Sequence, residues 1–119
     1  MAEVVGTDEF AAWFDELSKE HQKSVIHIVD LLERFGVQLG FPYSSDLKGT
    51  KHAFRELRVK AQGAQIRIAY AFDPQRDAVL LLGGDKVGDD RFYEWLIPAA
   101  EKIWLQYLKE REQAKRGDP

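Results

Sequence analysis

The amino-acid sequence predicts an α+β fold in which an antiparallel sheet is packed against an N-terminal helical hairpin and a C-terminal helix. Two changes of hydrophobic period predict this order: apolar residues recur at helical spacing up to residue 35, alternate between residues 54 and 72, and return to helical spacing from residue 92. At 119 residues the chain is long enough for one core and too short for two. We therefore expect residues 1–119 to form a single domain, with a polar tail from about residue 109.

The first third of the chain predicts a short edge strand at residues 3–5 followed by two helices. Thr7 or Asp8 is suited to cap the first helix and Ser18 the second, because these side chains accept hydrogen bonds from free backbone amides. Gly36 stands where a glycine commonly ends a helix. The apolar stripe between these signals comprises Phe10, Trp13, Phe14, Leu17, Val25, Ile28, Val29, Leu32 and Phe35.

The middle of the chain predicts three strands joined by short turns. The composition of residues 40–46 is typical of a loop, and apolar and polar residues alternate after it. Turns are expected at residues 61–64 and 73–77. The third strand is apolar throughout, which is typical of a strand covered on both faces. The predicted strands are residues 54–60, 65–72 and 78–82.

The C-terminal part predicts a glycine-rich loop over residues 83–90 and then a long helix, which Asp89 or Asp90 would cap. Pro98 lies inside this helix and is expected to kink or restart it, because proline has no amide hydrogen and clashes with the preceding turn. The polar residues from 109 onward are expected to fray.

Composition excludes several classes of site. The chain has no cysteine, which excludes disulfides, thiolate catalysis and cysteine-based zinc sites. The histidines His21, His27 and His52 are scattered without paired acids, so we expect no metal site and no cofactor. The first residues lack a signal-peptide pattern, and no apolar run approaches the ~18 residues of a membrane span. We therefore expect a cytoplasmic protein without a membrane partner.

Charge is unevenly placed along the sequence. The net charge of −3 and the pI of about 5.6 argue mildly against nucleic acid as a partner. Between Lys48 and Arg67, however, there are six lysines and arginines and a single acid, Glu56. This distribution predicts a locally basic patch on an acidic protein.

The first predicted hairpin brings two of these cations together. A turn centred on residues 62–63 places Arg58 directly opposite Arg67, on the face turned away from the apolar residues of both strands. The next hairpin places Arg67 near Gly83, with Lys86 just beyond the end of that strand. An anion such as phosphate would relieve the repulsion. The alternative, which the pattern leaves open, is a solvated cluster on an open sheet face, neutralised by Glu56 and Asp85.

The order of these motifs resembles the HigB branch of the RelE superfamily, which includes phage-derived Gp49-like proteins. The resemblance covers roughly residues 8 to 108 and depends on the motifs in combination, since none is specific alone. They are Leu47-Lys-Gly-Thr, Phe54-Arg-Glu-Leu-Arg-Val, Ile66-Arg-Ile-Ala-Tyr-Ala-Phe-Asp-Pro, Leu80-Leu-Leu-Gly-Gly-Asp-Lys and Asp90-Arg-Phe-Tyr-Glu.

This resemblance implies a RelE-like fold and the toxin of a type II toxin–antitoxin pair, which cuts translated mRNA on the ribosome without a metal. In such enzymes the RNA 2′-hydroxyl attacks the adjacent phosphate, and cationic side chains stabilise the charge that develops. By position, Arg58, Arg67 and Lys86 match the catalytic basic residues, and Tyr93 matches an aromatic residue that stacks on the substrate base. The implied partners are the ribosome, mRNA and a cognate antitoxin, expected to be of the helix-turn-helix kind and to pack on a sheet edge or on the helical hairpin.

Two further residues are assigned to substrate binding. Glu56 stands where relatives often carry a second basic residue, so it either acts as the general base or marks weakened activity. His52 could serve as an auxiliary base, or is a solvated loop histidine. Two other functions stay open: a non-enzymatic binder with the same fold, such as the gyrase inhibitors of the ParE branch, and a degenerate toxin kept as a complex-forming partner.

Overall fold

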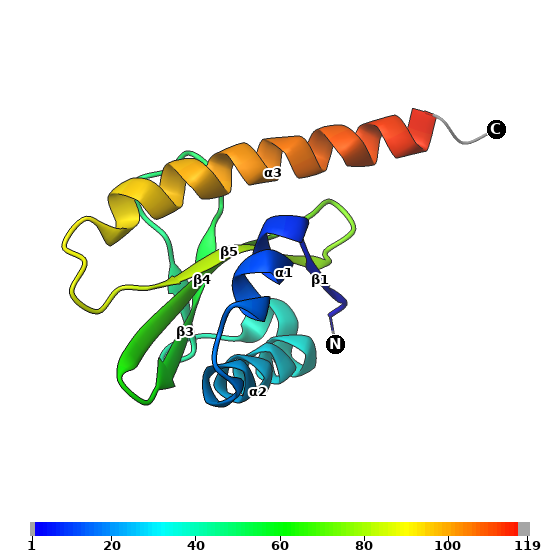
Figure 1. Ribbon diagram of the computed structural model, residues 1–119. Helices are drawn as coiled ribbons and strands as arrows, with labels where there is room; N and C mark the ends of the chain where they lie inside the picture. Colours follow the sequence, from blue (N-terminus) through cyan, green and yellow to red (C-terminus); the bar gives the residue numbers. More distant parts are fainter. Residues whose placement is uncertain (1, 117–119) are drawn as a thin grey trace.

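The computed structural model describes residues 2–116, which form one sheet with helices on both of its faces (Figure 1). The sheet has the order β1-β5-β4-β3-β2. A short 3-10 turn, Gly36–Gln38, follows the second helix. In chain order the elements are β1 (Val4–Gly6), α1 (Asp8–Asp15), α2 (Lys19–Phe35), β2 (Ser44–Asp46), β3 (Arg55–Ala61), β4 (Ala64–Phe72), β5 (Ala78–Asp85) and α3 (Phe92–Arg116).

The predicted α+β class is confirmed, and two strands differ from the expected details. β1 pairs with β5 in parallel, so the sheet is mixed at that edge. Residues 44–46, expected within a loop, form β2 and pair antiparallel with β3. Both strands have only three residues. A segment this short carries no readable period, and what it pairs with depends on the tertiary structure.

The helical hairpin is confirmed together with its caps. The Thr7 side chain accepts a hydrogen bond from the Phe10 amide, and the Ser18 side chain accepts one from the His21 amide. Gly36 ends α2 with a φ of 54°, a left-handed conformation that glycine adopts without strain. The buried stripe of the hairpin packs on one sheet face, in a core that includes Phe10, Val25, Ile28, Leu32, Leu57, Val59, Ile66, Ile68 and Tyr70.

The opposite face of the sheet is covered by α3, so the sheet lies between two helical layers (Figure 1). Ala69 and Ala71 of β4 are small, which allows α3 to lie close to the strands. Val79 and Leu81 of β5 point to this layer and Leu80 points to the other, which explains why that strand is apolar throughout. The helix contributes Phe92, Leu96, Ala100, Ile103 and Trp104.

Of the kink or restart predicted at Pro98, the restart is wrong, because α3 continues through this residue. Pro98 is exposed, so water can bond the backbone carbonyl that its missing amide leaves free. The fraying expected from residue 109 is also wrong as far as residue 116, while residues 117–119 lie outside the described part. The Tyr107 hydroxyl donates a hydrogen bond to Asp73 at 3.0 Å, and Arg111 lies 3.7 Å from the same carboxylate. These contacts with the β4–β5 turn tie the helix to the sheet beyond its apolar stripe.

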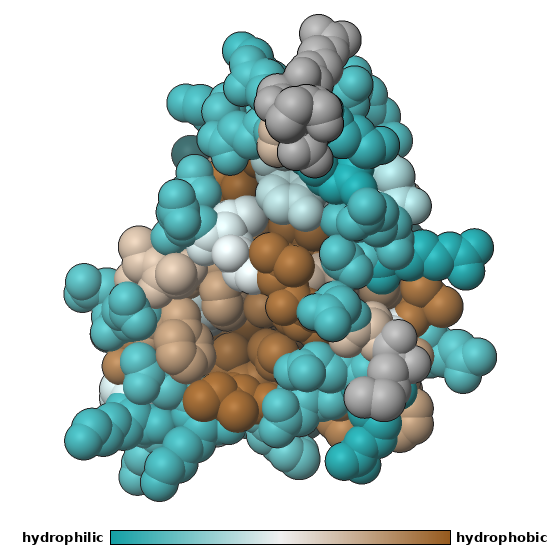
Figure 2. All heavy atoms as spheres, turned by 90° about the vertical axis from the view of Figure 1, so that its right-hand side faces the viewer, coloured by the Kyte–Doolittle hydropathy of each residue, from teal (hydrophilic) through white to brown (hydrophobic). Residues whose placement is uncertain are grey.

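Within residues 2–116, no helix has the length and apolarity that crossing a membrane requires. Figure 2, which views the molecule from the right-hand side of Figure 1, shows apolar side chains gathered in the centre of that face with polar side chains around them.

Gly83 and Gly84 lie inside β5 rather than in the predicted exit loop. Both residues are packed so closely that neither position has room for a side chain. A Cβ atom on Gly83 would lie 2.5 Å from the Trp13 ring, and one on Gly84 would lie 2.8 Å from Phe92 and Trp95. Aromatic side chains of α1 and α3 thus contact the same strand from opposite faces of the sheet. Glycines within a strand often mark such a close approach.

Gly83→Ala should lower the free energy of unfolding by about 1–3 kcal/mol, because the Trp13 ring must move out of its packed position. Gly40→Ala is the matched control, since its Cβ would meet nothing closer than 4.0 Å. Urea unfolding followed by circular dichroism measures both. Equal stability of the two variants would show that Trp13 does not pack on Gly83.

Candidate functional site

The first hairpin has the predicted register. Ala61 pairs with Ala64 around a two-residue turn, and Arg58 lies directly opposite Arg67. Strand alternation turns both arginines to the α3 side of the sheet, the side that Ala69 also faces. Two cations thus occupy neighbouring positions on one face, as the sequence predicted.

The second hairpin is shifted by one residue from the prediction. Arg67 pairs with Gly84 rather than Gly83, because a β-bulge inserts Leu81 of β5 opposite the pair Ala69 and Tyr70. Lys86 still follows the end of the strand, where its amide donates to Gln65 at 3.0 Å.

Asp85 does not neutralise the arginines. Its carboxylate accepts hydrogen bonds from the backbone amides of Gln65 and Val87 and thereby fixes the loop after β5. The alternative that assigned it to the arginines is therefore wrong in this respect.

A buried carboxylate, Glu56, organises the cluster. It accepts hydrogen bonds from the Tyr93 hydroxyl at 2.7 Å and from the Ser45 hydroxyl at 3.1 Å. Arg58 Nη1 lies 3.4 Å from Glu56 Oε2, and Arg67 Nε lies 4.0 Å from Oε1. Four side chains from three strands and α3 therefore converge on one carboxylate.

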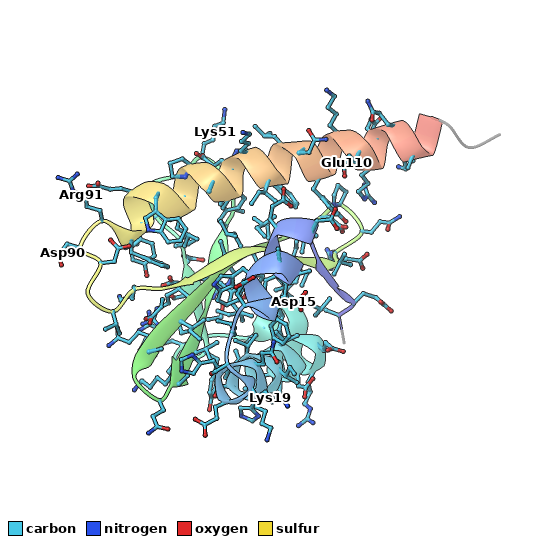
Figure 3. The ribbon with its side chains drawn as sticks, in the orientation of Figure 1. Asp15, Lys19, Lys51, Asp90, Arg91 and Glu110 are labelled. Atoms are coloured by element: carbon cyan, nitrogen blue, oxygen red, sulfur yellow. The ribbon has the colours of Figure 1, made fainter. Side chains whose placement is uncertain are left out.

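Burial contradicts the alternative of a solvated cluster on an open face. Glu56 and Arg67 are each 5% exposed. Charged residues elsewhere, such as Asp90 and Arg91, point away from the body of the molecule (Figure 3). Ionic groups are rarely buried unless they are paired, so the pair of Arg67 with Glu56 is a built feature rather than an incidental surface contact.

The guanidinium of Arg67 is incompletely paired. Its Nη1 donates to the Ile66 carbonyl at 3.0 Å, while its buried Nε has no hydrogen-bond partner within the described residues. A buried donor without a partner costs free energy. An anionic oxygen placed beside Arg67 would supply the missing acceptor.

Tyr93 is half-buried at the start of α3. Its ring lies 5.6 Å from the Lys86 ammonium, and its hydroxyl is held by Glu56. Burial raises the pKa of Tyr93 to about 12, and the hydrogen bond to Glu56 acts in the same direction. This contact joins Lys86 to the cluster through the Tyr93 ring, whereas Arg58, Arg67 and Tyr93 contact the Glu56 carboxylate directly.

Tyr93 should therefore remain protonated throughout the neutral and mildly alkaline range. Because its folded pKa of about 12 lies above the ordinary 10.0, the protonated phenol stabilises the fold fully below about pH 10, and this contribution is lost as the pH rises toward 12. The carbon NMR signal of its Cζ, assigned by comparison with Tyr93→Phe, should stay constant up to about pH 10. A midpoint at or below that pH would contradict the contact with Glu56.

His52 is not brought to this cluster. Its ring stacks on Phe54 at 5.1 Å, and its amide donates to the Thr50 hydroxyl. No contact described for His52 reaches Glu56 or the arginines. Its predicted substrate-binding role gains no support from this placement.

Sequence reasoning missed a cavity of about 280 Å³ beside the arginines. It also missed Ser45, because a polar triplet such as β2 carries no strand signal. The cavity lies where β3 extends past β2, and the segment 41–43 runs along that edge. Its lining residues are His27, Ile28, Phe41, Pro42, Tyr43, Arg58, Lys60 and Arg67.

Comparison with known protein families shows to which family this chain is related. Residues 12–105 match the family described as phage-derived protein Gp49-like. This chain belongs to that family. The HigB-like chain is 45% identical over 101 residues to a Mycobacterium tuberculosis protein named toxin HigB3, covering 83% of this chain and 87% of HigB3. It is 33% identical over 111 residues to one named toxin HigB2 from the same organism, covering 91% of this chain but only 55% of HigB2.

A solved structure supports the RelE-like fold. The toxin–antitoxin complex RelBE2 of Mycobacterium tuberculosis contains a chain that matches with a TM-score of 0.55 at 16% identity, over 71% of the HigB-like chain and 96% of that chain. The predicted resemblance to RelE/HigB toxins is thereby confirmed at the level of family and fold.

Proposed function

We propose that this HigB-like protein is the toxin of a type II toxin–antitoxin pair and acts as a metal-independent endoribonuclease on translated mRNA. The observation that carries the proposal is the arrangement of Arg58 and Arg67 around Glu56, in which the buried Arg67 Nε has no hydrogen-bond partner among the described residues. Two guanidinium groups at adjacent sheet positions are suited to hold a phosphodiester.

In the proposed reaction the ribose 2′-oxygen forms a bond to the adjacent phosphorus, and the bond from phosphorus to the 5′-oxygen breaks. The proton of the 2′-hydroxyl would go to solvent water, and the 5′-oxygen would take up a proton from the Lys86 ammonium as it leaves, giving a cyclic phosphate and a 5′-hydroxyl. Arg58 and Arg67 would stabilise the negative charge on the phosphoryl oxygens. Lys86, beside Tyr93, would assist the leaving oxygen.

Glu56 is better placed to position the arginines than to accept the proton. Its two oxygens are already contacted by Tyr93, Ser45 and Arg58. A substrate phosphate would compete with this carboxylate for the same donors. The same observation favours the second candidate function, a non-catalytic member kept as a complex-forming partner, since the cationic site already contains an anion.

Expression of the protein without an antitoxin tests the proposal. Growth should stop, and primer extension should reveal new 5′ ends inside open reading frames. Arg67→Met should abolish both effects, whereas Arg34→Met, which alters an exposed arginine at the end of α2, should abolish neither. Intact mRNA would overturn the proposed activity. If an induced DNA-damage response accompanied it, the result would favour gyrase as the target.

The proposed antitoxin contact is the outer surface of the helical hairpin. Ile26 is 49% exposed there, and the cavity that it lines includes Phe14 and Val29. The sheet edges offer less backbone, because β1 and β2 each have three residues. The antitoxin chain of RelBE2 supports the existence of such a partner for this fold.

A further inference from the structure

We propose that the cavity beside Arg58 and Arg67 is a subsite for a nucleobase, with Phe41 as its stacking surface. The inference deepens the proposed function and rests on it. It adds a specificity-determining contact that lies outside the cluster around Glu56.

The side chain of Phe41 is unusually exposed to solvent for an apolar residue. It is 77% exposed, the largest exposure among the large hydrophobic residues of the described chain, and Tyr43 is 42% exposed. The Arg58 guanidinium lies 5.4 Å from the centre of the Phe41 ring. An exposed aromatic ring costs hydration free energy unless a ligand covers it, and a planar base can do so by stacking.

The segment that carries these rings is held in place. The Arg58 amide donates to the Tyr43 carbonyl at 2.8 Å, and the amides of Tyr43 and Ser44 both donate to the Gly40 carbonyl. The aromatic wall is therefore attached to the strand that carries Arg58. A base on Phe41 and a phosphate on Arg58 would be bound by one rigid unit.

The charged side chains that line the cavity indicate which class of ligand it would bind. Its lining includes Arg58, Lys60 and Arg67 but no acidic residue, in a chain that has 20 acids. Its volume of about 280 Å³ lies at the lower end of ordinary small-molecule sites, which suits one planar group. Cationic side chains beside an aromatic wall are complementary to a nucleotide, which joins a flat π-system to a phosphate. Because Arg58 and Arg67 also belong to the Glu56 cluster, this nucleotide would lie next to the reacting phosphate.

A titration with adenosine 5′-monophosphate and with ribose 5-phosphate, followed by amide NMR shifts, separates the base from the phosphate. The wild-type protein should bind the nucleotide about tenfold more tightly than the sugar phosphate, because of stacking. In Phe41→Ala the two dissociation constants should become equal, through weaker nucleotide binding alone. Phe41→Trp should keep the difference, and Phe35→Ala, which removes an exposed phenylalanine from the end of α2, should leave it unchanged.

Equal binding of the two probes by the wild-type protein, or an unchanged ratio in Phe41→Ala, would overturn the subsite. If Phe41→Ala instead weakened binding of the antitoxin with the ratio unchanged, the surface would belong to a protein partner. Neither result bears on the phosphate site, which the Arg67→Met variant tests separately. Loss of affinity for both probes in that variant supports the proposed function. Unchanged affinity in that variant would count against the function itself.

Discussion

Arg67→Met should reduce RNA cleavage about 10²–10³-fold, the usual effect of removing one preorganised donor from a developing negative charge. Arg67 is buried and its Nε has no hydrogen-bond partner within residues 2–116, so the donor is already in place before the substrate arrives. Methionine is unbranched and fills most of the space of the arginine stem without its charge. Methionine is preferred to alanine for this test. Alanine would leave a cavity at position 67, because the Arg67 side chain is buried.

The same substitution should change the free energy of unfolding little, by no more than about 1 kcal/mol, because it removes a buried donor without a hydrogen-bond partner in residues 2–116 and leaves Glu56 in contact with Arg58, Tyr93 and Ser45. The Nε of Arg67 lies 4.0 Å from Glu56, the outer limit of an ion pair. Cleavage of ribosome-bound mRNA by purified protein and urea unfolding give the two values. A variant that cleaves at the wild-type rate would remove Arg67 from the reaction, whatever its stability.

Glu56→Ala should lower the free energy of unfolding by about 3–5 kcal/mol, the range found when one partner of a buried ion pair is removed. Arg58 and Arg67 would then face each other without a carboxylate, and the hydroxyls of Tyr93 and Ser45 would lose their acceptor. Glu94→Ala is the control, because its contact with Arg91 joins side chains that are 74% and 86% exposed. The control should cost no more than about 0.5 kcal/mol.

A double-mutant cycle separates the charge pair from general packing. If the pair accounts for the loss, Glu56→Ala combined with Arg67→Met should be more stable than the sum of the single changes by about 1–3 kcal/mol. Additive effects would show that the two charges are not coupled, and that the carboxylate stabilises the fold only through its hydroxyl partners.

The site was predictable where it depends on local rules. A hairpin with a two-residue turn has a register that follows from the position of the turn, so the opposition of Arg58 and Arg67 could be read from the residues. The pairing with β5 could not, because the bulge at Ala69 and Tyr70 shifts Arg67 from Gly83 to Gly84. A bulge leaves no reliable mark on the apolar alternation.

The role of Glu56 illustrates the other limit. The alternation of apolar and polar residues in β3 placed Glu56 on the correct face of the sheet. That face is buried at Glu56 because the first turn of α3 lies across it. The hydrogen bond between Glu56 and Tyr93 joins residues 37 positions apart in the chain. The aromatic wall of the cavity is similar, since Phe41 reaches Arg58 only because its segment runs beside β3.

The sequence by itself determined the α+β class, the capped helical hairpin, the three long strands and the opposed arginines. Each of these follows from the period of apolar residues, from cap residues or from the length of a turn, which act over a few neighbouring positions. Only the tertiary structure decided the parallel pairing of β1, the strand β2, the uninterrupted α3, the buried carboxylate and the cavity beside it. These features arise from packing between distant segments, and no local pattern encodes which surfaces will meet.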